Sequence, residues 1–175
     1  MIKRKILTIL AMVMSFGVYP VQADTVWTSG HHEIFDGDIY TEIWMYNDAT
    51  ADMFGGDVFQ LGALDASRFN MFEGTMDILM VRYNSIVNIY GGALDLMNVY
   101  PDENGLVNLY AYDVVYHPTG GGGYDYPWMG GKYLSNDQNF AFMLAPSAIS
   151  HINIVPEPAT IPLLGLGSLL FRKNR

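Results

Sequence analysis

Four segments of the chain repeat one pattern, and they read Ala51-Asp52-Met53-Phe54-Gly55-Gly56, Phe69-Asn70-Met71-Phe72-Glu73-Gly74, Val87-Asn88-Ile89-Tyr90-Gly91-Gly92 and Val107-Asn108-Leu109-Tyr110-Ala111-Tyr112. The Asp or Asn residues fall at positions 52, 70, 88 and 108, which gives spacings of 18, 18 and 20. A diverged copy, Glu33-Ile34-Phe35-Asp36-Gly37, lies one period before the first. A period this short, with residues typical of strands in every copy, indicates a solenoid whose coils stack on one another.

Each copy alternates with period two, as a strand with one buried face does. One face is apolar in every copy and is expected to point inward; it carries Ala51, Phe69, Val87 and Val107, followed by Met53, Met71, Ile89 and Leu109. The other face carries the Asp or Asn residue and then an aromatic ring. After the glycines a second arm begins, and we align Ile39, Val58, Met76, Leu94 and Val114 in one register. The pattern predicts an all-β fold, a short β-solenoid of about five coils with roughly 18–20 residues in each.

Two other folds are compatible with the period. A left-handed helix built of hexapeptides ranks second, because positions six apart do not keep an aliphatic residue, and the handedness of the solenoid stays open. A jelly-roll-like sandwich is the third, in which the period would reflect repeated hairpins.

The charge distribution argues against nucleic acid as a partner. The chain has 175 residues, enough for one domain, and a formal net charge of -9. Between residues 24 and 155 only Arg68, Arg82 and Lys132 are basic, against 17 acidic residues, so this segment carries a charge near -14. Such a surface repels phosphate backbones. There is no cysteine, which excludes disulfides and thiolate chemistry.

The N-terminal segment, residues 1–23, has the three zones of a secretory signal peptide. Lys3-Arg4-Lys5 is the charged zone, Ile6 to Val18 is the apolar zone, and Val21-Gln22-Ala23 provides the cleavage site after Ala23. The apolar zone is short for a bilayer crossing, which takes roughly 20 residues. The sequence therefore predicts export.

The C-terminus combines an extended proline motif, an apolar stretch and a basic tip. The motif is Pro156-Glu157-Pro158, the apolar stretch includes Leu163 to Leu170, and the tip holds Arg172, Lys173 and Arg175. The two prolines keep the backbone extended, so that Glu157 is displayed. The apolar run from Ala159 to Phe171 contains Pro162, and as a helix it would span only about 20 Å of a core about 30 Å thick.

In that order these parts closely resemble the PEP-CTERM sorting signal of exopolysaccharide-producing Gram-negative bacteria. The resemblance covers only this C-terminal segment. It implies an exported precursor anchored in the inner membrane by a short helix, with the basic tip in the cytoplasm. It also implies two processing partners, signal peptidase and an exosortase-type membrane protease that recognises the triad and removes the anchor. The destination implied is the cell envelope or the extracellular matrix.

The resulting organisation has four parts. Residues 1–23 are the signal peptide, 24–117 the repeat solenoid, 118–154 a Gly-rich loop and β cap, and 155–175 the sorting signal with its anchor helix.

Candidate binding residues lie on the outer face of the first arm. Phe54, Phe72, Tyr90 and Tyr110 form a candidate aromatic stripe able to contact sugar rings, or, as an alternative, rings that stack on one another and stiffen the coils. The Asp and Asn rank is expected to form a hydrogen-bonded ladder with a structural role. Acids in turns, such as Asp36 and Asp38, do not have the spacing of known calcium loops. The adjacent His31 and His32 would point to opposite faces of a strand, so we expect no metal site and no cofactor.

We expect no catalytic residues. Asp77 and Asp95 would lie about 5 Å apart on adjacent coils, near the separation in retaining glycosidases, but no acid–base cluster accompanies them. The sequence thus favours an exported, non-enzymatic surface or matrix protein, structural or adhesive and associated with exopolysaccharide. The alternative is a small β-helical carbohydrate-active enzyme, a lyase or hydrolase, which would show convergent acids in a cleft.

Overall fold

The computed structural model describes residues 21–22, 24–99, 104–119 and 126–156. These residues form one sheet of twelve strands and a short 3-10 helix, η1 (Ala148–His151). The strands are β1 (Val21–Gln22), β2 (Thr25–Trp27), β3 (His31–Ile34), β4 (Ile39–Met45), β5 (Thr50–Ala63), β6 (Arg68–Val81), β7 (Ile86–Ile89), β8 (Ala93–Val99), β9 (Leu106–His117), β10 (Trp128–Tyr133), β11 (Asn139–Leu144) and β12 (Ile152–Val155).

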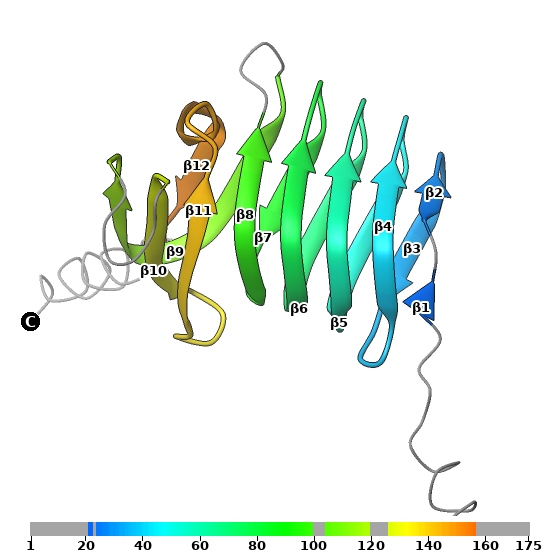
Figure 1. Ribbon diagram of the computed structural model, residues 1–175, viewed down its shortest axis with the longest axis horizontal. Coiled ribbons are helices and arrows are strands. Elements are labelled where there is room, and N and C mark those ends of the chain that lie inside the picture. Colours follow the sequence, from blue (N-terminus) through cyan, green and yellow to red (C-terminus); the bar gives the residue numbers. More distant parts are fainter. Residues whose placement is uncertain (1–20, 23, 100–103, 120–125, 157–175) are drawn as a thin grey trace, which may run out of the picture.

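The repeats stack as parallel strands in the predicted register. Asp52 of β5 pairs with Asn70 of β6, Asn70 with Asn88 of β7, and Asn88 with Asn108 of β9. The diverged copy joins the same ladder, because Glu33 of β3 pairs with Asp52. Figure 1 shows the parallel arrows side by side along the long axis. The chain is thus all-β, with stacked parallel strands that suggest a β-solenoid of about four turns; the sandwich of hairpins is wrong, because successive copies pair parallel.

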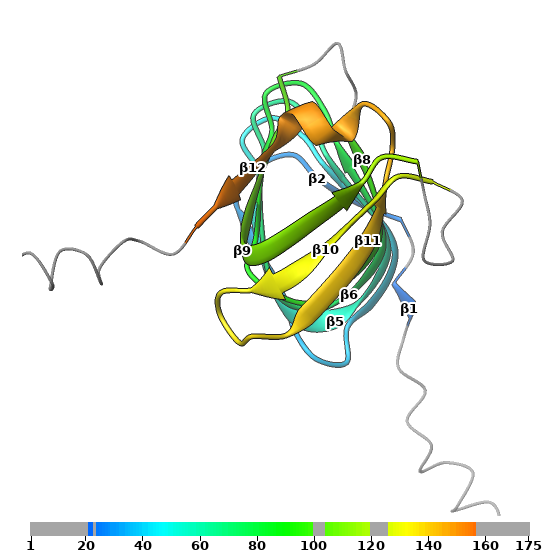
Figure 2. The same ribbon diagram turned by 90° about the vertical axis from the view of Figure 1, so that its left-hand side faces the viewer.

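The expectation of about five coils is wrong, because the fifth copy supplies only a first arm. The start of β9 stacks parallel on β7, but from Ala111 onward β9 pairs antiparallel with β10. Val114 is therefore not aligned with Leu94; β11 lies beside β8 instead, with Met143 opposite Leu96. The strands β9, β10 and β11 cross the end of the stack (Figure 2). The strand β12 returns to the first-arm side and stacks parallel on β9.

The predicted inward face of the first arm forms the core. All eight of its predicted residues are fully buried: Ala51, Phe69, Val87, Val107, Met53, Met71, Ile89 and Leu109. Each large apolar side chain buried in this way contributes roughly 1.5–3 kcal/mol to folding. In a chain with no disulfide, this continuous apolar column is what holds the coils together.

One predicted register in the second arm is wrong. Val58 pairs with Tyr40 rather than with Ile39, and it is Tyr40 that is buried. The reason is that the connection between the two arms is one residue longer in the diverged first copy: Ile34 pairs with Met53, 19 positions on, whereas Tyr40 pairs with Val58, 18 positions on. An alignment that keeps one offset through the whole copy therefore misplaces the arm by one residue.

Glycines connect the two arms of the coils. Gly56, Gly74 and Gly92 have φ of +81°, +94° and +92°, a region that is strained for residues with a Cβ. A Cβ at Gly74 would also lie 2.8 Å from the carbonyl oxygens of Gly55 and Gly56 in the coil below. The repeat therefore needs glycine here both for backbone conformation and for the close approach of the next coil.

We predict that Gly74→Ala lowers the free energy of unfolding by roughly 2–4 kcal/mol, since it combines backbone strain with a clash between coils. Chemical denaturation followed by circular dichroism measures the change. Gly30→Ala is the control, because Gly30 has φ +82° but a Cβ there would meet nothing within 4 Å; it should cost only about 1 kcal/mol. Equal losses in the two variants would show that the close approach of coils contributes nothing.

Candidate functional site

The aromatic stripe runs along the outer face of the first arm, where the sequence places it. The rings of Phe35, Phe54, Phe72, Tyr90 and Tyr110 stack in order, with centroid separations of 5.8, 5.1, 4.9 and 4.2 Å and interplanar angles of 5–20°. The faces of the three internal rings are therefore covered by neighbouring rings, and their edges point outward. This is the geometry expected of rings that stiffen the coils, and it leaves a sugar only ring edges to contact along most of the stripe.

The Asp and Asn rank forms the predicted ladder of side-chain hydrogen bonds. Asn70 Nδ2 donates to Asp52 Oδ1 at 2.6 Å, and Asn88 Nδ2 donates to Asn70 Oδ1 at 2.7 Å. Asn108 continues the ladder to Asn88 at 2.9 Å, and Asn153 of β12 to Asn108 at 3.0 Å. The rank thus extends through the last described strand and joins β12 to the repeats.

Asp52 sets the direction of this ladder. An ionised carboxylate only accepts hydrogen bonds, so Asn70 must turn its amide nitrogen toward Asp52. The oxygen of Asn70 then faces Asn88 and requires a nitrogen there, and the same choice is repeated at Asn108 and Asn153. All amide nitrogens consequently point toward the N-terminal end, and the ladder has a single polarity.

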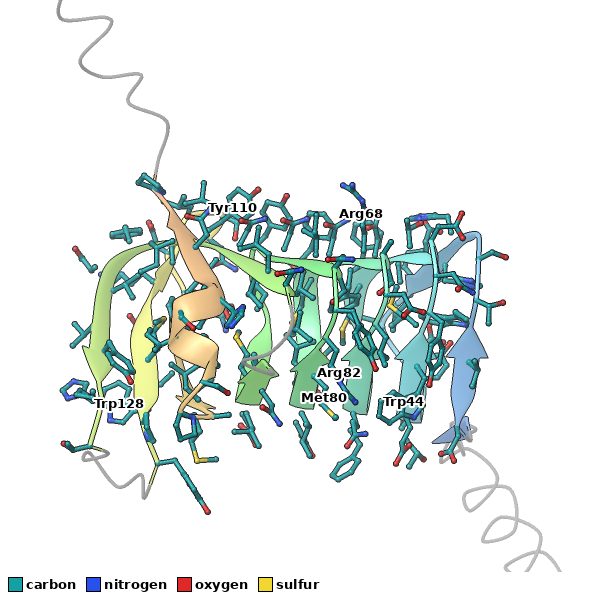
Figure 3. All side chains as sticks on the ribbon, turned by 90° about the horizontal axis from the view of Figure 1, so that it is seen from above. Trp44, Arg68, Met80, Arg82, Tyr110 and Trp128 are labelled. Atoms are coloured by element: carbon teal, nitrogen blue, oxygen red, sulfur yellow. The ribbon has the colours of Figure 1, made fainter. Side chains whose placement is uncertain are left out.

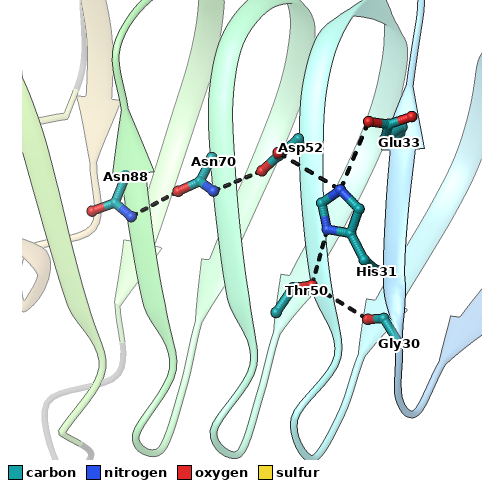
Figure 4. Close-up of polar contacts among 7 residues, drawn as sticks. All are labelled: Gly30, His31, Glu33, Thr50, Asp52, Asn70 and Asn88. Atoms are coloured by element: carbon teal, nitrogen blue, oxygen red, sulfur yellow. Dashed lines mark hydrogen bonds and ion pairs between the residues drawn. The ribbon is translucent and has the colours of Figure 1, made fainter.

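His31 closes the N-terminal end of the ladder (Figure 4). Its Nδ1 lies 3.0 Å from Thr50 Oγ1, and the Thr50 hydroxyl donates to the Gly30 carbonyl at 3.4 Å. The other ring nitrogen, Nε2, faces Glu33 Oε1 at 3.8 Å and Asp52 Oδ2 at 3.7 Å. These contacts were not predicted, since the four side chains belong to two repeat copies and to two ranks, His31 with Thr50 and Glu33 with Asp52.

The two neighbouring histidines point to opposite faces, as predicted. While His31 reaches Thr50, the ring of His32 stacks on Trp27 at a centroid distance of 4.3 Å. Within the residues that the structure describes, no group of three or more His, Asp or Glu side chains is placed to hold a metal ion. Asp38, a candidate calcium ligand in a turn, accepts a hydrogen bond from the Phe35 amide at 2.9 Å and so closes that turn.

The candidate catalytic acids lie on an open surface. Asp77 and Asp95 are both exposed, and their flanking residues are paired between β6 and β8, so they lie one strand apart. A groove of about 290 Å³ is lined by Asp57 and Asp77, but not by Asp95, together with apolar side chains such as Phe59. The residues described around this groove include two carboxylates and no cationic side chain.

The residues of the predicted export and sorting signals lie almost entirely outside the described residues. This holds for Ala23, at the predicted cleavage site, and for Glu157, Pro158, Arg172, Lys173 and Arg175. Pro156 is described and is exposed directly after β12. In the described part of the chain, no helix is long and apolar enough to span a membrane.

No protein-family model, curated protein or solved structure matches the chain. The candidate surface therefore has to be interpreted from its own geometry.

We predict that Asn88→Ala lowers the free energy of unfolding by roughly 1–3 kcal/mol, because it leaves the Asn70 oxygen and the Asn108 nitrogen without partners in a partly buried rank. Asn153→Ala, at the exposed end of the ladder, removes one bond and should cost about 1 kcal/mol or less. Urea denaturation of both variants measures the difference. A loss at Asn153 as large as that at Asn88 would mean that the amides do not act as one ladder.

The stripe also predicts a sensitivity to alkali. Burial raises the pKa of Tyr90 to about 12, with a further contribution from its hydrogen bond with the Tyr110 hydroxyl. An unfolded tyrosine loses its proton near pH 10. Between about pH 10 and pH 12 the unfolded state thus binds fewer protons than the folded state, so stability falls as pH rises. Thermal melts across this interval should fall less steeply for Tyr90→Phe than for the wild type, and equal slopes would contradict the assignment.

Proposed function

We propose that the chain is an exported, non-enzymatic structural or adhesive protein of the cell envelope or extracellular matrix, associated with exopolysaccharide. A signal peptide directs export, and an exosortase-type protease acts at Pro156-Glu157-Pro158 on a precursor held briefly in the inner membrane. The observation that carries the structural role is the outer face of the first arm. There the aromatic rings stack on the rings of the next coil, and the Asp and Asn side chains form hydrogen bonds with those of the next coil.

Ladders of this kind support a mechanical rather than a chemical role. Neighbouring aromatic pairs add roughly 0.5–1.5 kcal/mol each, and an amide ladder with its hydrogen bonds satisfied has few groups left to take part in a reaction. Residues 24–155 carry 17 acidic and three basic side chains, which keeps copies apart by repulsion and the protein soluble. A short, stiff and highly charged solenoid suits a component of a hydrated matrix.

The sorting step is supported by the resemblance of the C-terminal residues to PEP-CTERM signals and by the position of the motif. The strand β12 ends at Val155, and Pro156 follows it as an exposed residue. Pro156, the first residue of the triad, is therefore accessible while β12 stays paired in the ladder.

The alternative is a carbohydrate-active enzyme, and the pair Asp77 and Asp95 is the observation that favours it. They lie on the adjacent strands β6 and β8. The spacing between adjacent strands, about 4.8 Å, approaches the separation of about 5–5.5 Å between the two carboxyl groups of retaining glycosidases. Their exposure on an open surface weighs against it, because a general acid there lacks the burial that raises its pKa. The test is to incubate the protein with polysaccharides and to measure the release of reducing ends. Release by the wild type that is abolished in Asp77→Asn and in Asp95→Asn would establish the enzyme.

We predict that the protein recovered from the envelope and the medium lacks both ends of the chain, as intact-mass spectrometry would show. Glu157→Ala should keep the C-terminal tail and stay at the inner membrane, since the recognised carboxylate is gone. A strain without the exosortase-type protease should give the same retained form from the wild-type chain.

The matched control is Glu73→Ala, which removes an exposed acid of β6 and should leave processing unchanged. A tail that is intact in both the wild type and Glu157→Ala, with the protein at the inner membrane, would refute the sorting proposal. The solenoid would then be a tethered domain.

A further inference from the structure

Trp44 reaches over a glycine of the next coil on the outer side of the second arm. Trp44 of β4 pairs with Gly62 of β5. A Cβ built on Gly62 would be 2.4 Å from Trp44 Cε3 and 2.5 Å from Cζ3. The Cε3–Cζ3 edge of the indole thus occupies the space that a side chain at position 62 would fill, and Trp44 stays partly exposed.

A hydrogen bond fixes the ring in this orientation. Trp44 Nε1 donates to Glu42 Oε2 at 2.8 Å. Glu42 in turn pairs in register with Gln60 of the next coil. The edge of the indole is therefore bordered by a carboxylate with a second oxygen and by an amide, which together can accept and donate hydrogen bonds.

The environment of Trp44 differs from that of the aromatic stripe. The internal rings of the stripe have both faces covered by other rings, whereas no ring among residues 24–99, 104–119 and 126–156 stacks on Trp44, which is partly exposed. Met80 lies beyond Gly62 in the same register and is also partly exposed, so it extends the apolar strip by one coil. Figure 3 shows Trp44 and Met80 on the side of the solenoid opposite Arg68 and Tyr110.

A partly exposed indole with polar groups beside it matches the chemistry of a pyranose ring. The axial C–H groups of a sugar with equatorial hydroxyls form a flat apolar face that packs on the ring. The hydroxyls at its edge are then within reach of a carboxylate and an amide. The excess of acidic residues between positions 24 and 155 disfavours a polyanionic chain, so the sugar units should be neutral.

We infer that Trp44, Glu42 and Gln60 form a binding site for the neutral pyranose units of a polysaccharide. The inference rests on the proposed function and gives its exopolysaccharide contact a place, on the second arm rather than on the stripe. Met80 and the face of β6 beside it are available to the next unit of the same chain. The competing interpretation is that Trp44 only shields the backbone at Gly62 from water.

The test is isothermal titration of the full chain with cellohexaose, a neutral glucan, and with hexagalacturonate as an anionic hexasaccharide. Cellohexaose should bind to the wild type, and Trp44→Ala should weaken its binding roughly tenfold or more. Gly62→Ala should weaken it as well, because the added methyl displaces the ring. Glu42→Ala should also reduce affinity, whereas Trp44→Phe should keep part of it.

Two matched controls separate this site from the rest of the surface. Phe59→Ala removes an exposed ring of the same arm, 50 % accessible, and Phe54→Ala removes a ring of the stripe; both should bind cellohexaose like the wild type. Circular dichroism melts of every variant identify any loss of fold, and Glu42→Ala and Trp44→Phe test the site if Trp44→Ala does not fold.

The outcomes distinguish this inference from the proposed function. If the wild type binds and Trp44→Ala, Gly62→Ala and Glu42→Ala bind equally well, the site is wrong while the exopolysaccharide association stands. If Phe54→Ala abolishes binding instead, the stripe is the site. Stronger binding of hexagalacturonate than of cellohexaose overturns the neutral class of ligand. If neither oligosaccharide binds to the wild type, both this site and the polysaccharide contact in the proposed function fail, although sorting can still be confirmed independently.

Discussion

Parallel pairing in register is the constraint on which this structure depends. Because each full coil returns the chain to the same position one strand further on, the side chains within each arm lie over their counterparts in the neighbouring coil. Asp52 above Asn70 and Met53 above Met71 show the two consequences. Outside, a polar rank becomes a ladder; inside, an apolar rank becomes a column. A shift of one residue in any coil would exchange the two faces, so the core and the surface ladders enforce the same register.

The same constraint limits what the repetitive surface can bind. A rank of aromatic rings at strand spacing covers the ring faces, and a rank of amides satisfies its own hydrogen bonds. Asp52 gives the amide ladder one direction because its carboxylate accepts the hydrogen bond of Asn70. The ladder ends at Asp52, and His31 lies beside the second oxygen of that carboxylate. Self-complementarity therefore stabilises the solenoid and at the same time removes the groups that a ligand would use. Regular ladders are a source of stiffness rather than of recognition.

The sequence predicts the first arm well and the second arm poorly, for a physical reason. Strict alternation with an Asp or Asn landmark places Ala51, Asp52 and Met53 on their correct faces. Beyond the first arm, the diverged first copy has one more connecting residue than the next copy, so an alignment with a constant offset assigns Ile39 the place that Tyr40 occupies. Pattern matching also counts a fifth coil, because it cannot show that β9 leaves the stack to pair antiparallel with β10. That choice depends on distant strands, not on local sequence.

Recognition is more readily built where the repeat is broken. The rank that holds Trp44 continues with Gly62, Met80 and Asn98, so residues of different size and polarity follow one another at the repeat period. A large ring next to a glycine can lie down across it, whereas a ring next to another ring must stand and stack. The sequence does contain Trp44 and Gly62 one period apart, but it does not show that the indole reaches over the glycine. That contact can be recognised only when β4 and β5 are placed side by side. Departures from the repeat, rather than the repeat itself, are therefore where this solenoid has side chains that its own ladders do not already use.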